Sequence, residues 1–407
     1  MTDVSEMPTA QRSYPMPRSC PFGAPAEYAE LRESEPVSRV RLPSGRTAWL
    51  ITRHDYARRL LAHPDVSVDR AHPAYPGVTA QKAAFAHRPQ GFLTWMDPPE
   101  HTEHRRMLLS EFTLKRLQTI RPRVQDIVNG CIDEMLAAGP PADLVRHLAV
   151  AVPTLVICEL LGIPYGDRML FHERTSVIVD LGTTLEQRTQ ALRDVQTYLA
   201  DLVARKEAEP SDDLIGRMIQ KYRAAGTYDP GHMSGLATIL LTGGFETTAN
   251  MIALGIVALL EHPEERDRLA ADPALAGRAA DEMLRYFSVS DHATSRIATA
   301  DIEIGGVLIR KGDGVIASNL AADRDPEVFS DPDRLDVGRE TARHHLAFGY
   351  GIHQCIGQNL ASMELQVCYT TLLARVPTLR LAEPLDALRF KTDTNFYGVH
   401  EVPVTWS

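Results

Sequence analysis

Residues 348–357 read Phe-Gly-Tyr-Gly-Ile-His-Gln-Cys-Ile-Gly and place one cysteine, Cys355, among glycines. After this stretch apolar residues recur every three or four positions, which predicts a helix that begins just beyond the cysteine. The unpaired amides and positive dipole end of such a helix stabilise a thiolate, the form of cysteine that binds metals. Gly349 and Gly351 permit a tight bend with positive φ, and Gly357 leaves room for a flat group against the helix. A thiolate held in this way suits the iron of a haem.

Two other interpretations of Cys355 are open from the residues alone. The cysteine could be a small hydrophobic core residue, or it could join His344, His345 and His353 in a zinc site. Zinc sites usually present two pairs of ligands at short spacing, and this stretch does not. The haem interpretation accounts for several positions at once, and with them the stretch resembles the haem-ligand loop of the cytochrome P450 family. These positions are Phe348, Gly349, Gly351, His353, Cys355 and Gly357.

Charge and cysteine content narrow the class of protein. The chain has 43 basic and 53 acidic residues and a formal net charge of -10, so we expect no general binding to nucleic acid. Its 5 cysteines are odd in number and widely scattered, which argues against a disulfide framework and fits a reducing cytosol. Residues 1–20 are polar and lack the apolar core of a signal peptide or membrane anchor, and we expect them to be flexible. No linker divides the chain, so we expect one domain over residues 1–407. We also expect the protein to be cytoplasmic and monomeric.

A second decisive element is the helical pattern at residues 232–261. A helix of this length would span about 45 Å, enough to cross a whole domain. Its apolar part, residues 235–260, is long enough for a membrane span. Glu246 and Asn250 lie in the middle of it, and no second span exists for them to face. A buried central helix is therefore the better interpretation.

The middle of this helix carries Gly-Gly-Phe-Glu-Thr at residues 243–247. Two glycines weaken a helix by about 1 kcal/mol each relative to alanine, so a local reason such as the close approach of a ligand is expected. A hydroxyl next to them can bond back to a helical carbonyl and open a groove. Alone, the motif also fits a kinked core helix. It resembles the oxygen-binding signature of the P450 family, which implies that Glu246 and Thr247 are a catalytic acid–alcohol pair and that Gly243 and Gly244 lie against the haem.

The run Asp-Pro-Pro-Glu at residues 97–100 predicts a helix start, with the aspartate as cap and the first proline at the first helical position. His101 and Arg105 follow, four residues apart on one face. Alone, this pair fits a solvated polar face. In the P450 family the matching histidine and arginine contact the haem propionates, and guanidinium–carboxylate pairing is the chemistry those acids need. The resemblance implies the same role for Arg296 and His353.

Elsewhere short strands and helices alternate with turns. Residues 37–42 and 47–52 flank a Pro-Ser-Gly turn and predict a hairpin, and residues 302–318 contain further short paired strands. Helical patterns dominate residues 114–223. We therefore expect a fold that is mainly α with small β-sheets. The resemblance places the haem in this fold between the long central helix and the cysteine loop.

Two further groups of polar residues have no clear role from the residues alone. Glu282 and Arg285 lie three apart on a predicted helix, a common surface pair that contributes little to stability. The resemblance implies that they join Arg334 in a buried network that supports folding and haem retention. Asp291 and His292 could face a polar group of the substrate or form a surface bend.

The substrate side is predicted from one irregular segment and the family resemblance. Residues 67–95 are rich in proline, glycine and aromatic residues and read as a long connection, a kind of segment that is often functional. The resemblance makes this the loop that closes over substrate, and it makes residues 169–184 a lid. Core packing explains the pocket candidates equally well. They are Phe85, Phe92, Val177, Leu181, Leu240 and Phe396.

The resemblance extends over nearly the whole chain. Within the family, the chain is similar to the actinobacterial branch involved in secondary metabolism and xenobiotic oxidation. It implies a monooxygenase with haem b, ligated by Cys355, that inserts one oxygen atom of O2 into a C–H bond by hydroxylation or epoxidation. In such enzymes the thiolate pushes electron density onto iron and favours cleavage of the O–O bond. The implied substrate is an apolar small molecule such as a macrolide, polyene, sterol-like or polycyclic compound.

Electrons must come from elsewhere, because the chain contains no flavin or nicotinamide fingerprint. The resemblance implies a ferredoxin and its reductase as partners, docking near Cys355. Arg106, Lys115 and Arg116 could contribute to docking or could simply be solvated. Two alternatives remain, a haem sensor or carrier without oxygenase activity and a peroxide-driven oxidase. The acid–alcohol pair favours oxygenation with O2 over both.

Overall fold

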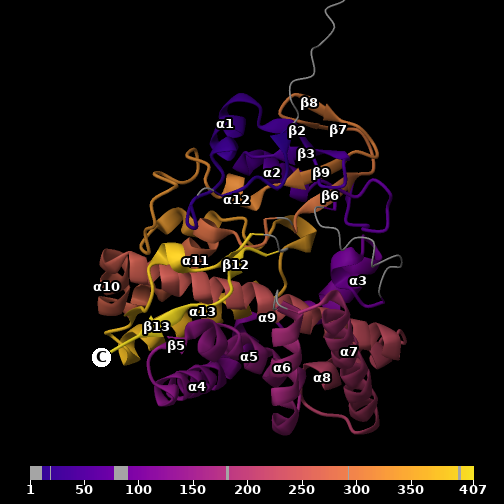
Figure 1. Ribbon diagram of the computed structural model, residues 1–407. Helices are drawn as coiled ribbons and strands as arrows, with labels where there is room; N and C mark the ends of the chain where they lie inside the picture. Colours follow the sequence, from indigo (N-terminus) through magenta and orange to yellow (C-terminus); the bar gives the residue numbers. More distant parts are fainter. Residues whose placement is uncertain (1–11, 19, 78–89, 180–182, 292, 393–395) are drawn as a thin grey trace, which may run out of the picture.

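The computed structural model describes residues 12–18, 20–77, 90–179, 183–291, 293–392 and 396–407. Helices form the body of the protein, and small sheets lie at its edges (Figure 1). The expectation of a mainly α fold with small β-sheets is confirmed. The helices are α1 (Ala26–Ser34), α2 (His54–Leu61), α3 (Glu100–Leu109), α4 (Leu114–Ala138), α5 (Ala151–Leu161), α6 (Arg168–Val179), α7 (Leu185–Ala208), α8 (Leu214–Ala224), α9 (Pro230–Glu261), α10 (Pro263–Ala271), α11 (Ala276–Phe287), α12 (Asn319–Ala322) and α13 (Gln358–Arg375).

The strands are short and gather in four sheets. A six-stranded sheet has the order β1-β2-β3-β9-β6-β4, a three-stranded sheet has the order β10-β13-β5, and β7-β8 and β11-β12 are two-stranded. The strands are β1 (Arg12–Ser13), β2 (Val37–Arg41), β3 (Thr47–Ile51), β4 (Val66–Ser67), β5 (Ala142–Asp143), β6 (Ser295–Ala298), β7 (Ile302–Ile304), β8 (Val307–Ile309), β9 (Gly314–Ala317), β10 (Arg380–Leu381), β11 (Phe390–Lys391), β12 (Gly398–Val399) and β13 (Pro403–Thr405).

The long helix predicted at residues 232–261 is α9, which runs through the middle of the helical body (Figure 1). Its start is well defined, because the Asp229 side chain accepts a hydrogen bond from the His232 amide and Pro230 occupies the first turn. Within the described residues α9 is the one helix long and apolar enough to cross a membrane, and 78% of its apolar window is buried inside the protein. Its apolar surface is therefore used in packing.

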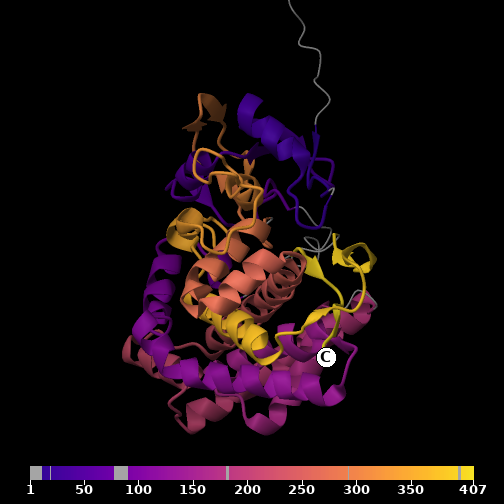
Figure 2. The ribbon, with the colours of Figure 1, turned by 90° about the vertical axis from the view of Figure 1, so that its left-hand side faces the viewer.

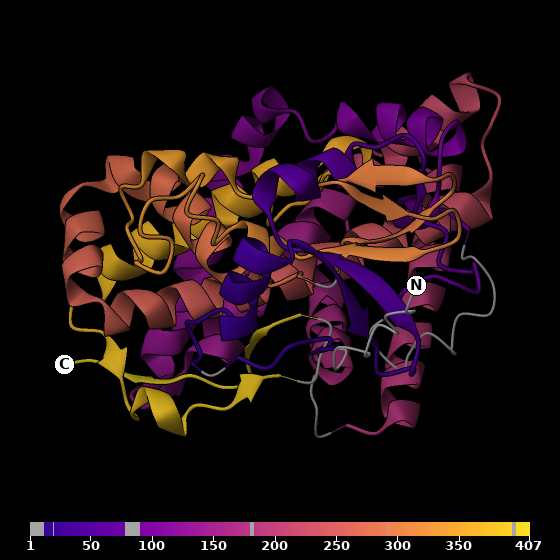
Figure 3. The ribbon, with the colours of Figure 1, turned by 90° about the horizontal axis from the view of Figure 1, so that it is seen from above.

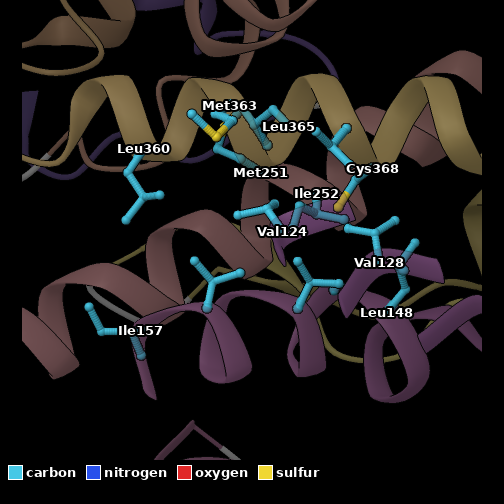
Figure 4. Close-up of a cluster of buried hydrophobic side chains, with 14 of the residues drawn as sticks. Val124, Val128, Leu148, Ile157, Met251, Ile252, Leu360, Met363, Leu365 and Cys368 are labelled. Atoms are coloured by element: carbon cyan, nitrogen blue, oxygen red, sulfur yellow. The ribbon is translucent and has the colours of Figure 1, made fainter. Parts of the chain in front are cut away.

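The main core lies where α9 meets α4, α5 and α13. Figure 4 shows Val124 and Val128 of α4, Ile252 of α9 and Cys368 of α13 in one continuous apolar cluster. α13 approaches α9 closely because Gly255 has no side chain. A Cβ there would lie 2.1 Å from the Tyr369 hydroxyl oxygen.

The six-stranded sheet joins distant parts of the chain. The predicted hairpin is present, with β2 and β3 antiparallel and Arg39 opposite Trp49. β3 pairs in parallel with β9, which pairs antiparallel with β6 and places Arg296 opposite Val315. Seen from above, the orange strands β6–β9 lie beside the indigo β2 and β3 (Figure 3). Arg296 therefore projects from the interior of a sheet, a rigid position.

The C-terminal strands form a separate layer along the helical body, drawn in yellow in Figure 2. β13 lies between β10 and β5, and β11 and β12 form a small hairpin with Phe390 opposite Val399. This hairpin packs on α9. The strands near the C-terminus are thus paired, and one of the pairs touches the central helix.

The N-terminal segment differs from expectation from Arg12 onward, while residues 1–11 and 19 lie outside the described residues. β1 pairs in parallel with β2, and Tyr14 is buried. The hydroxyls of Tyr14 and Tyr28 donate hydrogen bonds to the Asp291 carboxylate, and so does that of Ser318. Asp291 therefore holds the N-terminal segment in place. It was expected to face the substrate or to form a surface bend, and its carboxylate instead binds these hydroxyls. His292 lies outside the described residues.

The structure corrects one member of the predicted buried network. Glu282 and Arg285 form a fully buried ion pair at 2.7 Å, as expected. The second arginine on the Glu282 carboxylate is Arg339, at 3.1 Å, and not Arg334. The Arg334 side chain is exposed, and this residue contributes its backbone carbonyl, which accepts from Arg339 and Arg285. The two arginines lie close together in the sequence, and the turn between them decides which side chain points inward.

We predict that Arg339→Ala lowers the free energy of unfolding by about 3 kcal/mol, because it removes one partner from a buried carboxylate. Arg334→Ala, which truncates an exposed side chain, is expected to change it by less than about 0.5 kcal/mol. Urea denaturation of the two variants beside the parent protein measures both values. Equal losses in the two variants would contradict this assignment.

Candidate functional site

A cavity of about 320 Å³ lies between α9 and the cysteine loop, within the size range of small-molecule sites. α9 contributes Gly243, Gly244 and Thr247 to its walls, and the loop contributes Cys355 and Gly357. The two decisive motifs of the sequence, far apart along the chain, therefore line one cavity.

The cysteine loop has the bend that its glycines allow. Gly349 and Gly351 have φ of 70° and 75°, values that favour glycine. A side chain at Gly351 is excluded for a second reason, because its Cβ would lie 2.5 Å from the Leu61 carbonyl oxygen. The bend closes with a hydrogen bond of 2.9 Å from the Cys355 amide to the Phe348 carbonyl. This geometry holds the cysteine just before α13, which begins at Gln358.

Cys355 differs electrostatically from the core cysteines. It opens onto the cavity, yet protein surrounds its thiol closely and this burial raises the thiol pKa. The amides of Gly357 and Gln358 and the Arg105 guanidinium act in the opposite direction and favour the thiolate. Burial raises the pKa of Cys131 and Cys158 to about 12 with no comparable set of donors. Among these cysteines, Cys355 has the surroundings that favour a thiolate able to bind a metal ion.

The zinc alternative finds no support in the part of the chain that the structure describes. No three histidine, cysteine or acidic side chains there are arranged to hold a metal ion. The His345 ring lies against Phe348, and the His344 carbonyl is hydrogen-bonded to the His54 ring. The histidines near the loop are thus engaged in packing and hydrogen bonding.

The Gly-Gly motif leaves the wall of α9 open. A Cβ at Gly243 would have no neighbour within 4 Å, and one at Gly244 would lie 3.6 Å from the Ile157 side chain. Thr247 Oγ1 donates to the Gly243 carbonyl at 3.1 Å, the back-bond that the sequence suggested. The helix stays α-helical through the motif and shows no wider turn. The opening comes from the missing side chains.

Glu246 lies apart from the cavity. It is not among the described residues that line it, whereas its neighbour Thr247 is. Burial of its carboxyl raises the pKa of Glu246, and the positive charges of Lys391 and Arg188 oppose this shift. The acid and the alcohol of the pair therefore have different surroundings, on different sides of α9.

Four nitrogen-bearing side chains gather at one end of the cavity: His101, Arg105, Arg296 and His353. The rings of His101 and His353 lie 4.1 Å apart, and Arg105 donates to the Gln354 carbonyl at 2.6 Å. Both ring nitrogens of His101 and the Nε of Arg296 are buried without a partner in the described structure. Buried donors of this kind normally have acceptors, so this end of the cavity is built for an anion.

The pKa values of this cluster agree with that interpretation. Burial, reinforced by Arg105, lowers the pKa of His101 to about 4. Burial, reinforced by Arg296, lowers the pKa of His353 to about 2. Burial also lowers the pKa of Arg296. Arg296, His101 and Arg105 disfavour positive charge on His353, and Arg105 disfavours it on His101. Carboxylates placed among them would oppose that penalty.

The start of α3 differs from the predicted one. The helix begins at Glu100, and no side chain caps it. The Asp97 side chain instead accepts from the Ser67 hydroxyl and the Val68 amide. Asp97 therefore ties the irregular segment to the start of the helix that carries His101 and Arg105.

The predicted pocket residues fall into three groups. Leu240 and Phe396 line the cavity. Phe92 and Val177 are not among its described lining residues, and Phe85 and Leu181 lie outside the described part of the chain. In place of Phe92 the short helical turn at Leu93–Trp95 directs Leu93 inward, and α6, which carries Val177, packs against α5 and α7.

Two charged residues on the cavity were missed by the sequence reasoning. Arg70 lines it, with a buried Nε that has no partner in the described structure and a guanidinium 5.1 Å from the centre of the Trp95 ring. Glu364 lines it from α13, and burial raises its carboxyl pKa well above the usual value. No local pattern marks either residue, because one lies in an irregular segment and the other in a regular helix.

Comparison with known proteins identifies the family. Residues 25–272 and 275–381 match the family model "Cytochrome P450". The chain is 46% identical over 409 residues to the vitamin D3 dihydroxylase of Streptomyces griseolus, covering 100% of both. It superimposes on the crystal structure of cytochrome P450 MoxA from Nonomuraea recticatena with a TM-score of 0.93, at 49% identity, covering 97% of this chain and 98% of that one. The structure of CYP105P1 in complex with filipin I gives a TM-score of 0.91, at 41% identity, covering 98% and 99%.

The chain therefore belongs to the cytochrome P450 family, and it is a haem-dependent monooxygenase. The predictions of haem b as cofactor and of oxidoreductase chemistry are confirmed. The residues present fit this cofactor. Cys355 offers a thiol to iron, Gly243 leaves space for a flat ring system, and the unpartnered nitrogens of His101 and Arg296 suit its two carboxylates.

We predict that Arg105→Met weakens haem retention, because it removes a charged donor to a carboxylate, an interaction of about 1.5–3 kcal/mol. Transfer of haem to excess apomyoglobin is expected to accelerate roughly tenfold or more. Arg106→Met, an exposed neighbour on the same helix, is the matched control and is expected to behave like the parent protein. Equal rates for both variants would show that Arg105 does not hold the haem.

Proposed function

We propose that this monooxygenase hydroxylates a bulky apolar small molecule of the macrolide, polyene, sterol-like or polycyclic class at a C–H bond. The observation that carries the proposal is the apolar wall next to Thr247. Leu93, Leu236, Leu240 and Phe396 line the cavity on that side. Apolar walls of this kind bind ligands mainly by removing apolar surface from water. The relative named as a vitamin D3 dihydroxylase and the solved complex with filipin I support the class.

Residue roles follow from the geometry as part of this proposal. Cys355 is the thiolate ligand, and His101, Arg105, Arg296 and His353 hold the haem carboxylates. When bound through a thiolate, the haem iron supplies the chemistry that activates O2. Gly243 leaves the space for that reaction.

Protons come from the protein side. Thr247 can release its bond to the Gly243 carbonyl and donate its hydroxyl proton into the cavity. Glu246, whose raised pKa reflects burial partly opposed by Lys391 and Arg188, exchanges protons with solvent and restores the proton on the threonine side. The acid–alcohol pair favours this role over a haem sensor or carrier, which has no need of proton delivery.

A ferredoxin, supplied in turn by its reductase, is the proposed electron donor. Exposed apolar residues flank the cysteine loop: Leu109 at the end of α3, Leu114 at the start of α4 and Ile352 in the loop. The exposed basic residues Arg106 and Lys115 stand beside them, whereas Arg116 is paired with Glu111. A mixed apolar and basic surface over the thiolate suits a small acidic electron carrier.

We also propose that the chain acts as one domain and as a cytoplasmic monomer. The main core cluster contains residues from Phe22 near one end of the chain to Val404 near the other, which supports a single domain. The burial of α9 supports a location in the aqueous phase.

The substrate proposal is tested by optical titration of the resting holoenzyme with a panel of such compounds. A compound that enters the cavity beside Thr247 is expected to displace the water on the iron and to shift the spectrum from low spin to high spin. A shift with one chemical class identifies the substrate class. Shifts confined to small polar compounds would overturn the proposal.

The proton-delivery role is tested with the identified substrate, NAD(P)H, ferredoxin and its reductase. Thr247→Ala is expected to lower the product formed per NAD(P)H roughly tenfold or more, because a donor in the reacting site is lost. Thr242→Ala is the matched control, since Thr242 bonds back to the Thr238 carbonyl on the same helix and is not among the described residues lining the cavity. Product formation without ferredoxin would reject that partner, and unchanged yield in Thr247→Ala would reject the role of Thr247.

A further inference from the structure

A buried lysine lies against α9 on the side of Glu246. Lys391, on strand β11, is only 6% exposed, and lysine is almost never buried without a partner. Its Nζ donates to Asn250 Oδ1 at 2.9 Å, and both residues are buried. Neither the cavity wall nor the haem-binding cluster among the described residues includes Lys391 or Asn250. The fold therefore buries a cation beside the catalytic helix for a separate reason.

The position of Asn250 links this lysine to Glu246. Asn250 follows Glu246 by one helical turn, so the two side chains lie on the same face of α9. Lys391 can only donate, which fixes Oδ1 of Asn250 toward it. The Nδ2 of Asn250 is a buried donor without a partner in the described structure. A carboxylate one turn earlier is the acceptor that this donor lacks.

The backbone opposite is shaped for the same contact. Gly398, on the neighbouring strand β12, faces Asn250, and a Cβ there would lie 2.2 Å from Asn250 Oδ1. Gly398 pairs with Lys391 across the hairpin. The hairpin can approach α9 closely only because this position is a glycine, so the lysine and the glycine together place the ammonium group against Asn250, one turn from the acid.

We propose that Lys391, tied by its hydrogen bond to Asn250 on the same face of α9, is a positioning residue for Glu246 and favours the ionised form of that acid. The proposal rests on the proton-delivery role proposed above for Glu246. Burial alone favours the protonated acid, and a protonated acid cannot accept the next proton from solvent. Lys391 from β11 and Arg188 from α7 are the two charges that oppose burial. Lys391 is the one that is tied to α9 by a hydrogen bond.

The same hairpin also reaches the substrate. Phe396 lies between β11 and β12 in the chain and lines the cavity. A substrate that moves Phe396 therefore acts on the hairpin that carries Lys391. Lys391 and one residue of the substrate wall therefore lie in the same segment of the chain.

The experiment compares Lys391→Met with Lys391→Arg in the reconstituted holoenzyme. Loss of the charge is expected to raise the pKa of Glu246 further, because the positive charge of Lys391 opposes the effect of burial. Product per NAD(P)H, measured between pH 5 and pH 9, is then expected to fall on the acidic side at a higher pH than in the parent. Lys391→Arg, which keeps the charge, is expected to restore the parent profile. Lys391→Gln gives the same comparison if Lys391→Met does not fold.

A second measurement does not depend on activity. A carboxyl with a raised pKa in the folded state contributes stability below its unfolded pKa of about 4.3, and this contribution is lost as pH rises through the folded pKa. Lys391→Met is expected to extend this loss to higher pH when thermal unfolding is followed from pH 4 to pH 8. In a Glu246→Gln background, the same substitution is expected to leave this part of the pH dependence unchanged.

The outcomes separate the two proposals. If Glu246→Gln leaves product per NAD(P)H unchanged, the role of the acid itself is wrong. If Glu246→Gln uncouples the enzyme but Lys391→Met shifts neither the pH profile nor the pH dependence of unfolding, the lysine is structural only and this inference is wrong. A shift in both, abolished by Glu246→Gln and restored by Lys391→Arg, is the expected result.

Discussion

Four buried nitrogen-bearing side chains, His101, Arg105, Arg296 and His353, share one end of the cavity without an acidic partner among the described residues. The arginines lower the affinity of the two histidines for a proton, and both ring nitrogens of His101 lack a hydrogen-bond partner in the described structure. Leaving such donors buried costs about 1–3 kcal/mol each, so the arrangement is stable only with carboxylates among them. Under the proposed assignment the two acids of the haem would meet this need, and the residues that hold the cofactor would in turn depend on it for their own stability.

Under the proposed assignment, a bound haem would contact both the six-stranded sheet and the helical core. Arg296 projects from the interior of the six-stranded sheet, whereas Cys355 precedes α13, which packs on α4 and α9 in the helical core. Arg105 joins the two sides, because its guanidinium contacts the cysteine loop from α3. A ligand held at one end by the sheet and at the other by the loop ties the sheet region to the helical body. Loss of the cofactor should thus loosen the relation between these regions before it affects the core of either one.

The sequence predicted the parts of this site that depend on local backbone geometry, and it failed where a choice between neighbouring side chains had to be made. Glycines beside a cysteine and a pair of glycines inside a long helix require special backbone conditions, so both motifs could be located from the pattern alone. Arg334 was expected in the buried network that Arg339 completes, and Phe92 was expected where Leu93 lines the cavity. In each case the direction of a side chain depends on one turn of irregular chain, which residue type and spacing do not determine. Lys391 was missed because its partner Asn250 is distant in the sequence, and Arg70 was missed because it lies in an irregular segment.

The central helix explains why the acid and the alcohol of one dipeptide can act in different surroundings. Adjacent residues on an α-helix point about 100° apart, so Thr247 can face the cavity while Glu246 faces a buried polar pocket. If both side chains faced the cavity, or if both faced the apolar core, either the acid or the alcohol could not take part in proton transfer. An acid in the apolar core would stay protonated, and an acid in the cavity would compete with the substrate for apolar surface. On the face that carries Asn250, the charge of Lys391 opposes the effect of burial on the carboxyl without exposing the acid to substrate. This separation of the acid from the alcohol follows from the helical period itself.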